Sequence, residues 1–191
     1  MGTGSSGSAA KASPRARRRV RVLRVGHRPG RDPRLTTHVA LVARAFGAER
    51  MYLHPPDPRV AATVDQLRSR WGGGFSVEPA PSWKEVVRAS AGPVVHLTMY
   101  GRPLAAVLPR LRRASELLVV VGGAKVPAAL YGAATYNVSV GSQPHSEVAA
   151  LAVLLERLLG LPSARPLTGA RQRIVPSARA KTVVAVRAGR P

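Results

Sequence analysis

Apolar residues along this chain fall into short runs that alternate with amphipathic stretches. The runs VVHL (94–97) and LLVVVG (117–122) show no polar alternation, which is typical of strands covered on both faces. Between such runs, apolar residues recur at intervals of three and four, which predicts helices. Because each parallel neighbour needs a crossover, this alternation predicts an α/β domain with a largely parallel sheet.

The predicted elements place three segments at strand ends. Strands are expected at 20–25, 50–53, 75–78, 93–97, 116–122 and 136–140, and helices at 36–48, 58–71, after Ser82, at 103–114 and from Pro144 onward. Ligands of parallel sheets bind beyond the carboxyl ends of the strands. The candidate ligand segments are therefore Thr98–Arg102, Gly122–Pro127 and Gly141–Glu147.

The residues at the start of the last helix are unusually polar. Pro144 suits a first helical turn, Ser142 or Gln143 could cap it, and Glu147 favours the positive end of the helix dipole. The expected buried stripe is Val148, Leu151, Ala152, Leu155 and Leu158. Capping explains one or two of the polar residues Ser142, Gln143, His145, Ser146 and Glu147, so the surplus predicts a binding site.

Charge and composition narrow the choice of partner. The formal net charge is +21, and both ends contribute: residues 1–19 and 161–191 contain basic residues but no acidic ones. A disordered basic arm (1–19), one domain (20–160) and a basic extension (161–191) with a hairpin around Pro176–Ala180 are expected. This charge favours a polyanion such as RNA, although an arginine-rich codon bias would also raise it.

Several other classes of protein lose support. The chain has no cysteine and no apolar run long enough for a membrane span, and Met1–Arg19 lacks the apolar middle of a signal peptide. The five histidines are scattered, so no metal site is expected. We expect a cytoplasmic protein that binds no membrane.

Individual residues at the strand ends permit more than one interpretation. Arg28, Arg31 and Arg34 follow the first strand and suit phosphate contacts, or they belong to a solvated loop with Asp32 as partner. Gly122 and Gly123 let a ligand approach the backbone closely, or they form a simple turn. His96 is interpreted as a core histidine.

Four segments in this order resemble one family. GHRPGRDPRLTTHVALVARAFGA, VVHLTMYG, VVVGGAKVP and NVSVGSQPHSEVAALAVLL are similar to the archaeal tRNA (cytidine-56) 2′-O-methyltransferases of the SPOUT superfamily, over about residues 20–159. The resemblance implies a C-terminal trefoil knot, a homodimer, S-adenosylmethionine as methyl donor, and the ribose 2′-hydroxyl of C56 in the tRNA T-loop as acceptor.

The resemblance also implies site residues. The cofactor pocket would comprise Leu97, Gly122, Gly123, Ala124, Lys125, Val126, Val140, Gly141, Ser142, Gln143, Pro144, His145, Ser146 and Glu147. Ala124 and Ser142 depart from the Glu and Asn that family members often carry. Arg34, His38 and Arg44 are candidates for activating the hydroxyl, while Arg44 could instead pair with Glu49 or with a partner subunit.

Two rival functions stay open at this point. One is a methyltransferase of the same superfamily that acts on another RNA position. The other is a non-catalytic RNA-binding protein, although an aromatic content of 4% offers few stacking platforms for single-stranded bases. The surplus of polar residues at the start of the last helix favours an enzyme over a non-catalytic RNA-binding protein.

Overall fold

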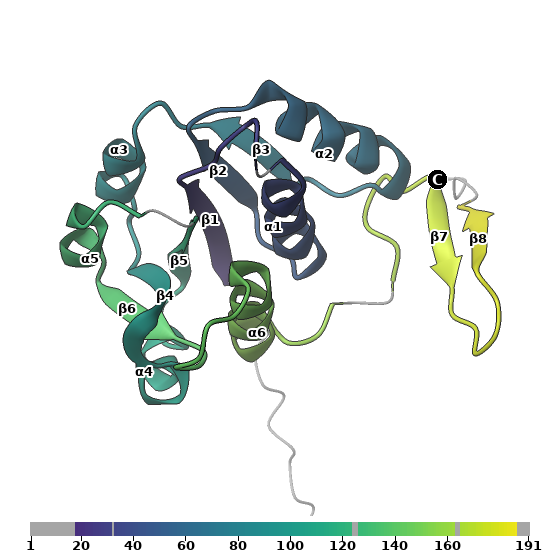
Figure 1. The fold of residues 1–191 in the computed structure, drawn as a ribbon. Helices are drawn as coiled ribbons and strands as arrows, with labels where there is room; N and C mark the ends of the chain where they lie inside the picture. Colours follow the sequence, from purple (N-terminus) through teal and green to yellow (C-terminus); the bar gives the residue numbers. More distant parts are fainter. Residues whose placement is uncertain (1–17, 32, 124–125, 163–164, 187–191) are drawn as a thin grey trace, which may run out of the picture.

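A six-stranded parallel sheet forms the centre of the molecule (Figure 1). The computed structural model describes residues 18–31, 33–123, 126–162 and 165–186. The strands are β1 (Arg19–Val25), β2 (Arg50–His54), β3 (Ser76–Pro79), β4 (Val94–Pro103), β5 (Glu116–Gly122) and β6 (Tyr136–Ser139), in the order β3-β2-β1-β5-β4-β6. All neighbouring pairs run parallel, which confirms the predicted α/β class.

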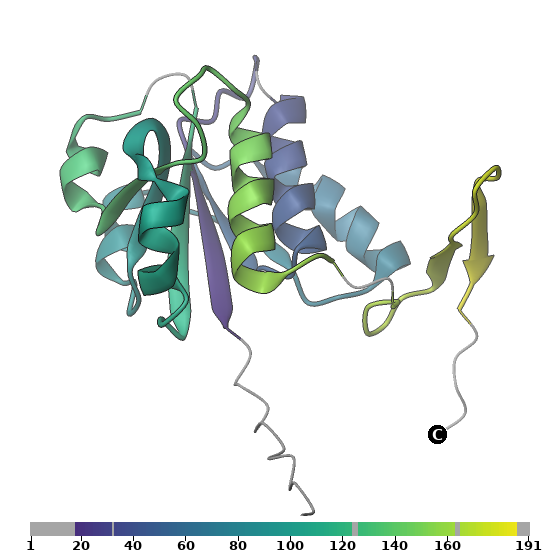
Figure 2. The same cartoon turned by 90° about the horizontal axis from the view of Figure 1, so that it is seen from below.

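Helices cover both faces of this sheet (Figure 2). They are α1 (Pro33–Ala45), α2 (Pro58–Trp71), α3 (Trp83–Arg88), α4 (Leu104–Leu111), α5 (Ala129–Ala133) and α6 (Glu147–Leu159). Strand residues alternate between two cores, as the two-residue period of a strand requires. Val20 and Val22 of β1 pack toward residues of α1, α2, α4 and α6. Leu23 and Val25 pack on the other face, toward residues of α3 and α5.

Helix α6 begins later than its sequence indicates. Ser146 is the N-cap, and its Oγ accepts the backbone N–H of Val148 at 3.2 Å. The predictions that Pro144 lies in the first turn and that Ser142 or Gln143 caps the helix are therefore wrong. Leu151, Leu155 and Leu158 are buried as predicted, and Ala150 and Leu154 join them, while Val148 and Ala152 are half-buried. The buried face is broader because α6 packs beside α1 as well as on the sheet (Figure 2).

Two other helices differ from expectation. Helix α1 begins and ends three residues before the predicted bounds, and Gly47, with φ of 86°, follows its end. Helix α5 was not predicted, because a five-residue segment that contains a glycine shows little helical periodicity.

The described part of the chain begins with residues that belong to the folded domain, before the predicted domain boundary. Residues 1–17 of the expected arm lie outside the described residues, but Arg19 belongs to β1. The guanidinium of Arg18 donates to the carbonyl oxygens of Arg112, Ala114 and Leu158 at the C-terminal ends of α4 and α6. Because such carbonyls have no partner within their helix, they hold the arginine in place. The arm prediction is thus wrong for Arg18 and Arg19.

The C-terminal extension forms a separate two-stranded sheet. Strands β7 (Gln172–Val175) and β8 (Thr182–Ala185) pair antiparallel. Figures 1 and 2 show this pair standing away from the main body, on the side of α2. Among the described residues, no helix has the length and apolar character that a membrane span needs.

Candidate functional site

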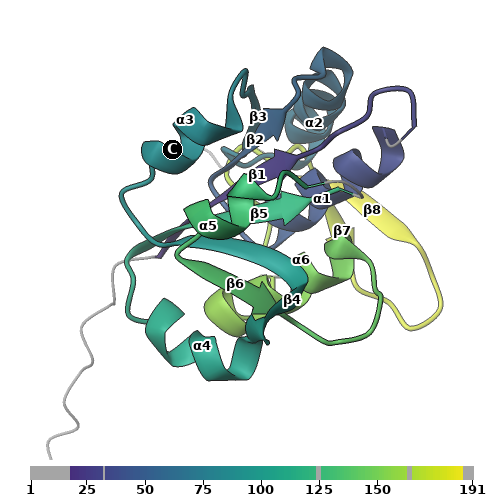
Figure 3. The same cartoon turned by 60° about the vertical axis from the view of Figure 1, so that its left-hand side comes forward.

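A hollow of about 630 Å³ lies at the carboxyl ends of β1, β4, β5 and β6. Part of each of the three segments predicted at strand ends lines it: 98–100, the glycines and Val126 after β5, and His145 and Glu147 before and in α6. Further wall residues come from β1, β4, β6, α1, α5 and α6. Figure 3 shows these strand ends and the start of α6 from the side. A concave site of this size is in the range of small-molecule pockets. The structure thus brings parts of the three predicted ligand segments together around one hollow.

The structure brings together half of the predicted cofactor residues. Those that line the hollow are Leu97, Gly122, Gly123, Val126, Val140, His145 and Glu147. Gly141, Ser142, Gln143, Pro144 and Ser146 are exposed and do not line it, and Ser146 instead caps α6. Ala124 and Lys125 lie outside the described residues. The exposed residues 141–144 connect two wall residues, Val140 and His145, and so border the opening.

A buried arginine links two walls of the hollow. The side chain of Arg24 on β1 is 0% exposed. Its Nη1 donates to the carbonyl oxygen of Gly122 at 2.6 Å, and its Nη2 lies 3.1 Å from Oε1 of Glu147. A buried charge must be paired to be tolerated. Arg24 therefore ties the end of β5 to the first turn of α6, two segments that are distant in sequence.

Sequence reasoning missed Arg24, although a signal for it exists. In β1, Val20, Val22 and Arg24 alternate onto one face, and the two valines are core residues. A strand period of two thus places an arginine at an inward position. Such a charge at the carboxyl end of a central strand indicates a polar site rather than a solvated edge.

His96 is buried as predicted, but it also lines the hollow. Its Nδ1 lies 2.8 Å from Oδ1 of Asn137, whose Nδ2 donates to the carbonyl oxygen of Tyr131 at 2.9 Å. This second bond fixes the amide orientation, so Nδ1 of His96 carries the proton. Burial lowers the pKa of His96, with the Asn137 hydrogen bond opposing the shift. The imidazole of His96 therefore contributes an uncharged surface to the wall of the hollow.

An irregularity in β4 shapes the wall beside His96. Leu97 and Arg102 both pair with Val138 of β6, so the four residues between them leave the regular ladder. Tyr100, in this bulge, is 80% exposed at the hollow. A Cβ on Gly101 would overlap the backbone of Asn137 and Val138. Glycine is required there because β6 approaches too closely for any side chain.

The loop after β1 is held by a buried polar network. His27 lies with Nδ1 2.8 Å from the hydroxyl of Thr36 and Nε2 3.1 Å from Oδ2 of Asp57. Hydrogen bonds from Arg59 lower the pKa of Asp57 to about 2, and the His27 bond adds to this against the effect of burial. The network joins this loop to α1 and α2, and it places Arg28, the next residue, at the hollow.

The three candidates for hydroxyl activation lie elsewhere in the molecule. Arg34 and His38 line a second hollow of about 330 Å³ between α1 and α2. Arg44, near the other end of α1, donates from Nη2 to the carbonyl oxygen of Gly72 at 2.6 Å, and burial lowers its pKa. Helical rise puts it about 14 Å along the axis from Leu35, which lines the first hollow. Among residues 18–186 as described, none of the three lines that hollow.

The suggested pairing of Arg44 with Glu49 is wrong. Glu49 instead lies 3.5 Å from Nε of Arg19 and 3.4 Å from Nε of Arg21, because its position before β2 brings it to the amino end of β1. In the described part of the chain, no group of three or more His, Cys, Asp or Glu residues comes together as a metal site would need.

Comparison with known proteins decides the family. Residues 71–184 match the family model described as tRNA ribose 2′-O-methyltransferase, aTrm56. The chain belongs to this family. The match includes β7 and most of β8, so the likeness extends beyond the 20–159 range of the sequence resemblance.

Curated relatives agree over almost their whole length. A tRNA (cytidine(56)-2′-O)-methyltransferase of Archaeoglobus fulgidus is 50% identical over 165 residues, which cover 86% of this chain and 98% of the relative. The enzyme of the same name from Cenarchaeum symbiosum is 48% identical over 169 residues, covering 87% and 97%. The enzyme of the same name from Thermococcus kodakarensis is 49% identical over 176 residues, which cover 88% of this chain and 98% of the relative.

Solved structures share the fold at low sequence identity. An RNA 2′-O ribose methyltransferase superposes with a TM-score of 0.56 at 17% identity, covering 81% of this chain and 60% of that one. The SpoU methyltransferase AviRb from Streptomyces viridochromogenes, in complex with AdoMet, gives 0.51 at 18%, covering 76% and 58%. These likenesses show that the sheet and its helices share the fold of those two proteins.

Proposed function

We propose that this protein transfers a methyl group from S-adenosylmethionine to the ribose 2′-hydroxyl of cytidine 56 in tRNA. One observation carries the proposal: wall residues from four strand ends and from the start of α6 converge on one hollow. The family and its curated relatives, which are named for this reaction, supply the substrate.

The residues of the hollow fit this methyl donor. Leu97, Val126, Val138 and Val140 provide apolar wall for an adenine ring, and the backbone around Gly122 and Gly123 can be approached closely. Glu147 presents a carboxylate, already oriented by Arg24, that suits a cationic part of the ligand. When bound, S-adenosylmethionine supplies an electrophilic methyl group on a sulfonium. The walls hold its position and exclude water from one side.

Alignment of the acceptor is the second task of the site. In-line displacement requires the 2′-hydroxyl oxygen close to the methyl group and opposite its leaving sulfur. Arg28 lies at the hollow on the loop after β1, where its guanidinium can bind a phosphate of the RNA backbone. Tyr100, largely exposed on the opposite wall, offers a ring against which a base can stack.

Proton removal is assigned, as a proposal, to one or more of Arg34, His38 and Arg44. Arg34 adjoins Leu35, a wall residue of the hollow, and His38 lies one helical turn further along α1. Burial lowers the pKa of Arg44, the direction that base catalysis by a guanidine needs. Its hydrogen bond to Gly72 instead favours a structural role.

We also propose the trefoil knot, a homodimer and a cytoplasmic location. The path of α6 supports the knot: α6 follows the edge strand β6, yet it packs beside α1, which lies over the middle of the sheet (Figure 2). Val153, 39% exposed on α6, gives a dimer contact some apolar surface. Light scattering of the purified protein tests the dimer directly.

The experiment that tests the function uses an unmodified tRNA transcript, the purified protein and methyl-labelled S-adenosylmethionine. Label on the ribose of C56 supports the proposal, and a transcript with a 2′-deoxycytidine at position 56 is the matched control that should take up none. Label at another nucleotide would support methyltransferase activity but contradict the assignment of cytidine 56 as the methylated position. Cofactor binding without any label would contradict catalysis on this transcript.

A further inference from the structure

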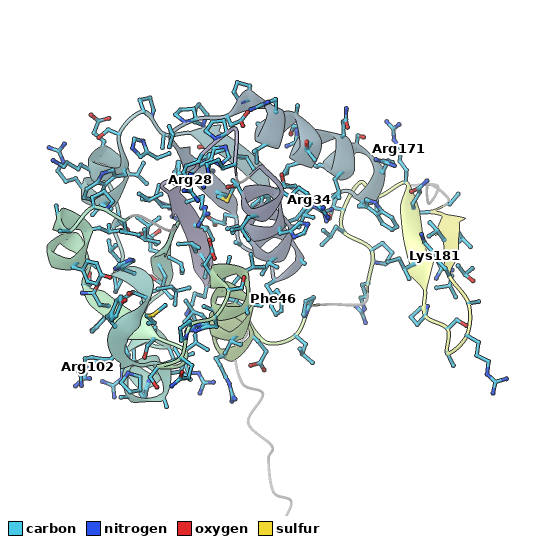
Figure 4. All side chains as sticks on the ribbon, viewed as in Figure 1. Arg28, Arg34, Phe46, Arg102, Arg171 and Lys181 are labelled. Atoms are coloured by element: carbon cyan, nitrogen blue, oxygen red, sulfur yellow. The ribbon has the colours of Figure 1, made fainter. Side chains whose placement is uncertain are left out.

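The pair of strands β7 and β8 is a basic surface that the reaction at the hollow leaves unused. Residues 161–186 contain no Asp or Glu. Arg171, Arg173, Arg179 and Lys181 are all exposed. Among the described residues, none of these four side chains forms an ion pair. Figure 4 shows Arg171 and Lys181 extending from this pair, apart from Arg28 and Arg34 near α1.

Strand alternation gathers two of the arginines on one face. Arg173 pairs with Val184, and the backbone N–H of Val186 donates to the carbonyl oxygen of Arg171, so both arginines lie on the same side of the ladder. They are about 7 Å apart along the strand. Ile174 and Val183 form a cross-strand pair on the opposite side, 63% and 42% exposed. One face of the hairpin thus presents both arginines beside Val184, and the other face presents Ile174 and Val183.

The base of the hairpin is seated firmly on α2. The N–H of Gly73 donates to the carbonyl oxygen of Thr168 at 2.8 Å, and the N–H of Arg171 donates to that of Arg70 at 2.9 Å. A Cβ on Gly72 would overlap the backbone of Ala170 and come within 2.6 Å of the Thr168 oxygen. Because two glycines permit this close contact, the hairpin leaves the body at a defined place and is not a loose tail.

We infer that the hairpin is a second RNA-contact arm, which binds tRNA backbone phosphates at a distance from the methylated ribose. This inference rests on the proposed function, in that tRNA is the substrate. Exposed arginines without acidic neighbours suit phosphate oxygens, which the guanidinium can bind in pairs. Phosphate contacts carry no sequence information, but they set the register of an RNA on the protein. The arm adds affinity for tRNA and leaves cofactor binding untouched.

Matched double substitutions test whether the β7–β8 hairpin binds tRNA. R171Q/R173Q and R179Q/K181Q each remove two charges from the hairpin, and K84Q/R88Q removes two exposed charges from α3, on the other side of the sheet (Figure 1). Binding of tRNA is measured over a range of salt concentrations. The slope of log affinity against log salt should fall by about 0.7 to 0.9 for each phosphate that a hairpin variant no longer binds. The α3 variant should keep the wild-type slope.

The other outcomes separate this inference from its rivals. Equal slopes for hairpin and α3 variants would overturn it. A change of molecular mass by light scattering in the hairpin variants, with the tRNA slope intact, would assign the hairpin to a second copy of the chain and also overturn it. Cofactor affinity, measured by calorimetry, should not change. A further outcome is that the wild-type protein binds tRNA with a salt dependence that the hairpin substitutions reduce, and yet leaves C56 unmethylated. That result would contradict the proposed function and still support tRNA binding by the hairpin.

Discussion

Strand β1 carries arginines at both ends, but their surroundings differ. At the amino end, Arg19 and Arg21 share Glu116, at 2.6 and 3.1 Å, and all three side chains are partly exposed. At the carboxyl end, Arg24 meets Glu147 at 3.1 Å with no exposure of its own. Exposed pairs contribute little because water screens them, whereas a buried charge depends on its partner. Burial, rather than the number of charges, therefore distinguishes a site from a solvated surface.

The largest effect is expected where the buried pair is broken. Arg24→Met leaves Glu147 and the Gly122 carbonyl without their partner, but Glu147 is 27% exposed and water can solvate it in part, so we expect a loss of about 2 to 3 kcal/mol in unfolding free energy. Cofactor affinity should fall at least tenfold, because the two walls lose their link. Urea unfolding and calorimetry measure the two effects. Arg21→Met, on the same strand, is the control and should cost under about 1 kcal/mol; equal losses for both variants would contradict the comparison.

A second prediction compares two glycines that follow wall residues of the hollow, Gly101 after Tyr100 and Gly141 after Val140. Gly101→Ala places a Cβ into the backbone of β6, so β4 and β6 must separate locally; we expect a loss of about 2 to 3 kcal/mol and weaker cofactor binding. Gly141→Ala meets no atom within 4 Å and has no positive φ, so its effect should stay within about 0.5 kcal/mol. Thermal unfolding of both variants, with and without cofactor, provides the measurement. Similar melting temperatures for the two would show that β6 yields at Gly101.

A third prediction uses pH to isolate the buried network at Asp57. Its pKa is lowered from 3.8 to about 2 in the folded state, so the carboxylate stabilises the fold above pH 4 and loses this contribution as pH falls through about 2. The shift corresponds to about 2 kcal/mol at pH 7 and about half of that near pH 3. Asp57→Asn keeps the N-cap and removes the charge. Urea unfolding should therefore show a smaller difference in unfolding free energy between wild type and variant at pH 3 than at pH 7. A difference from wild type that is independent of pH would exclude the charge as its cause.

The sequence predicts the sheet better than the site, for a physical reason. Strands such as Val94–Leu97 are recognisable from their local apolar pattern, and the strand-end rule locates the ligand segments. The start of α6 was misplaced because Ser142 and Ser146 are equally good caps locally, and only tertiary contacts select between them. The links of Arg24 to Gly122 and Glu147 span about a hundred residues, so no local pattern reveals the partners.

The smallest effect is expected at the exposed end of β1. Glu116→Gln removes the carboxylate shared by Arg19 and Arg21, but both arginines keep Glu49 within 3.5 Å and remain accessible to water. We expect a loss of about 0.5 kcal/mol that shrinks further at high salt, because ions screen exposed pairs. Urea unfolding at low and at molar salt measures this, with Glu147→Gln as the matched variant at the buried end. Glu147→Gln should cost more, and its cost should depend less on salt, because Arg24 is shielded from the ions that screen Arg19 and Arg21.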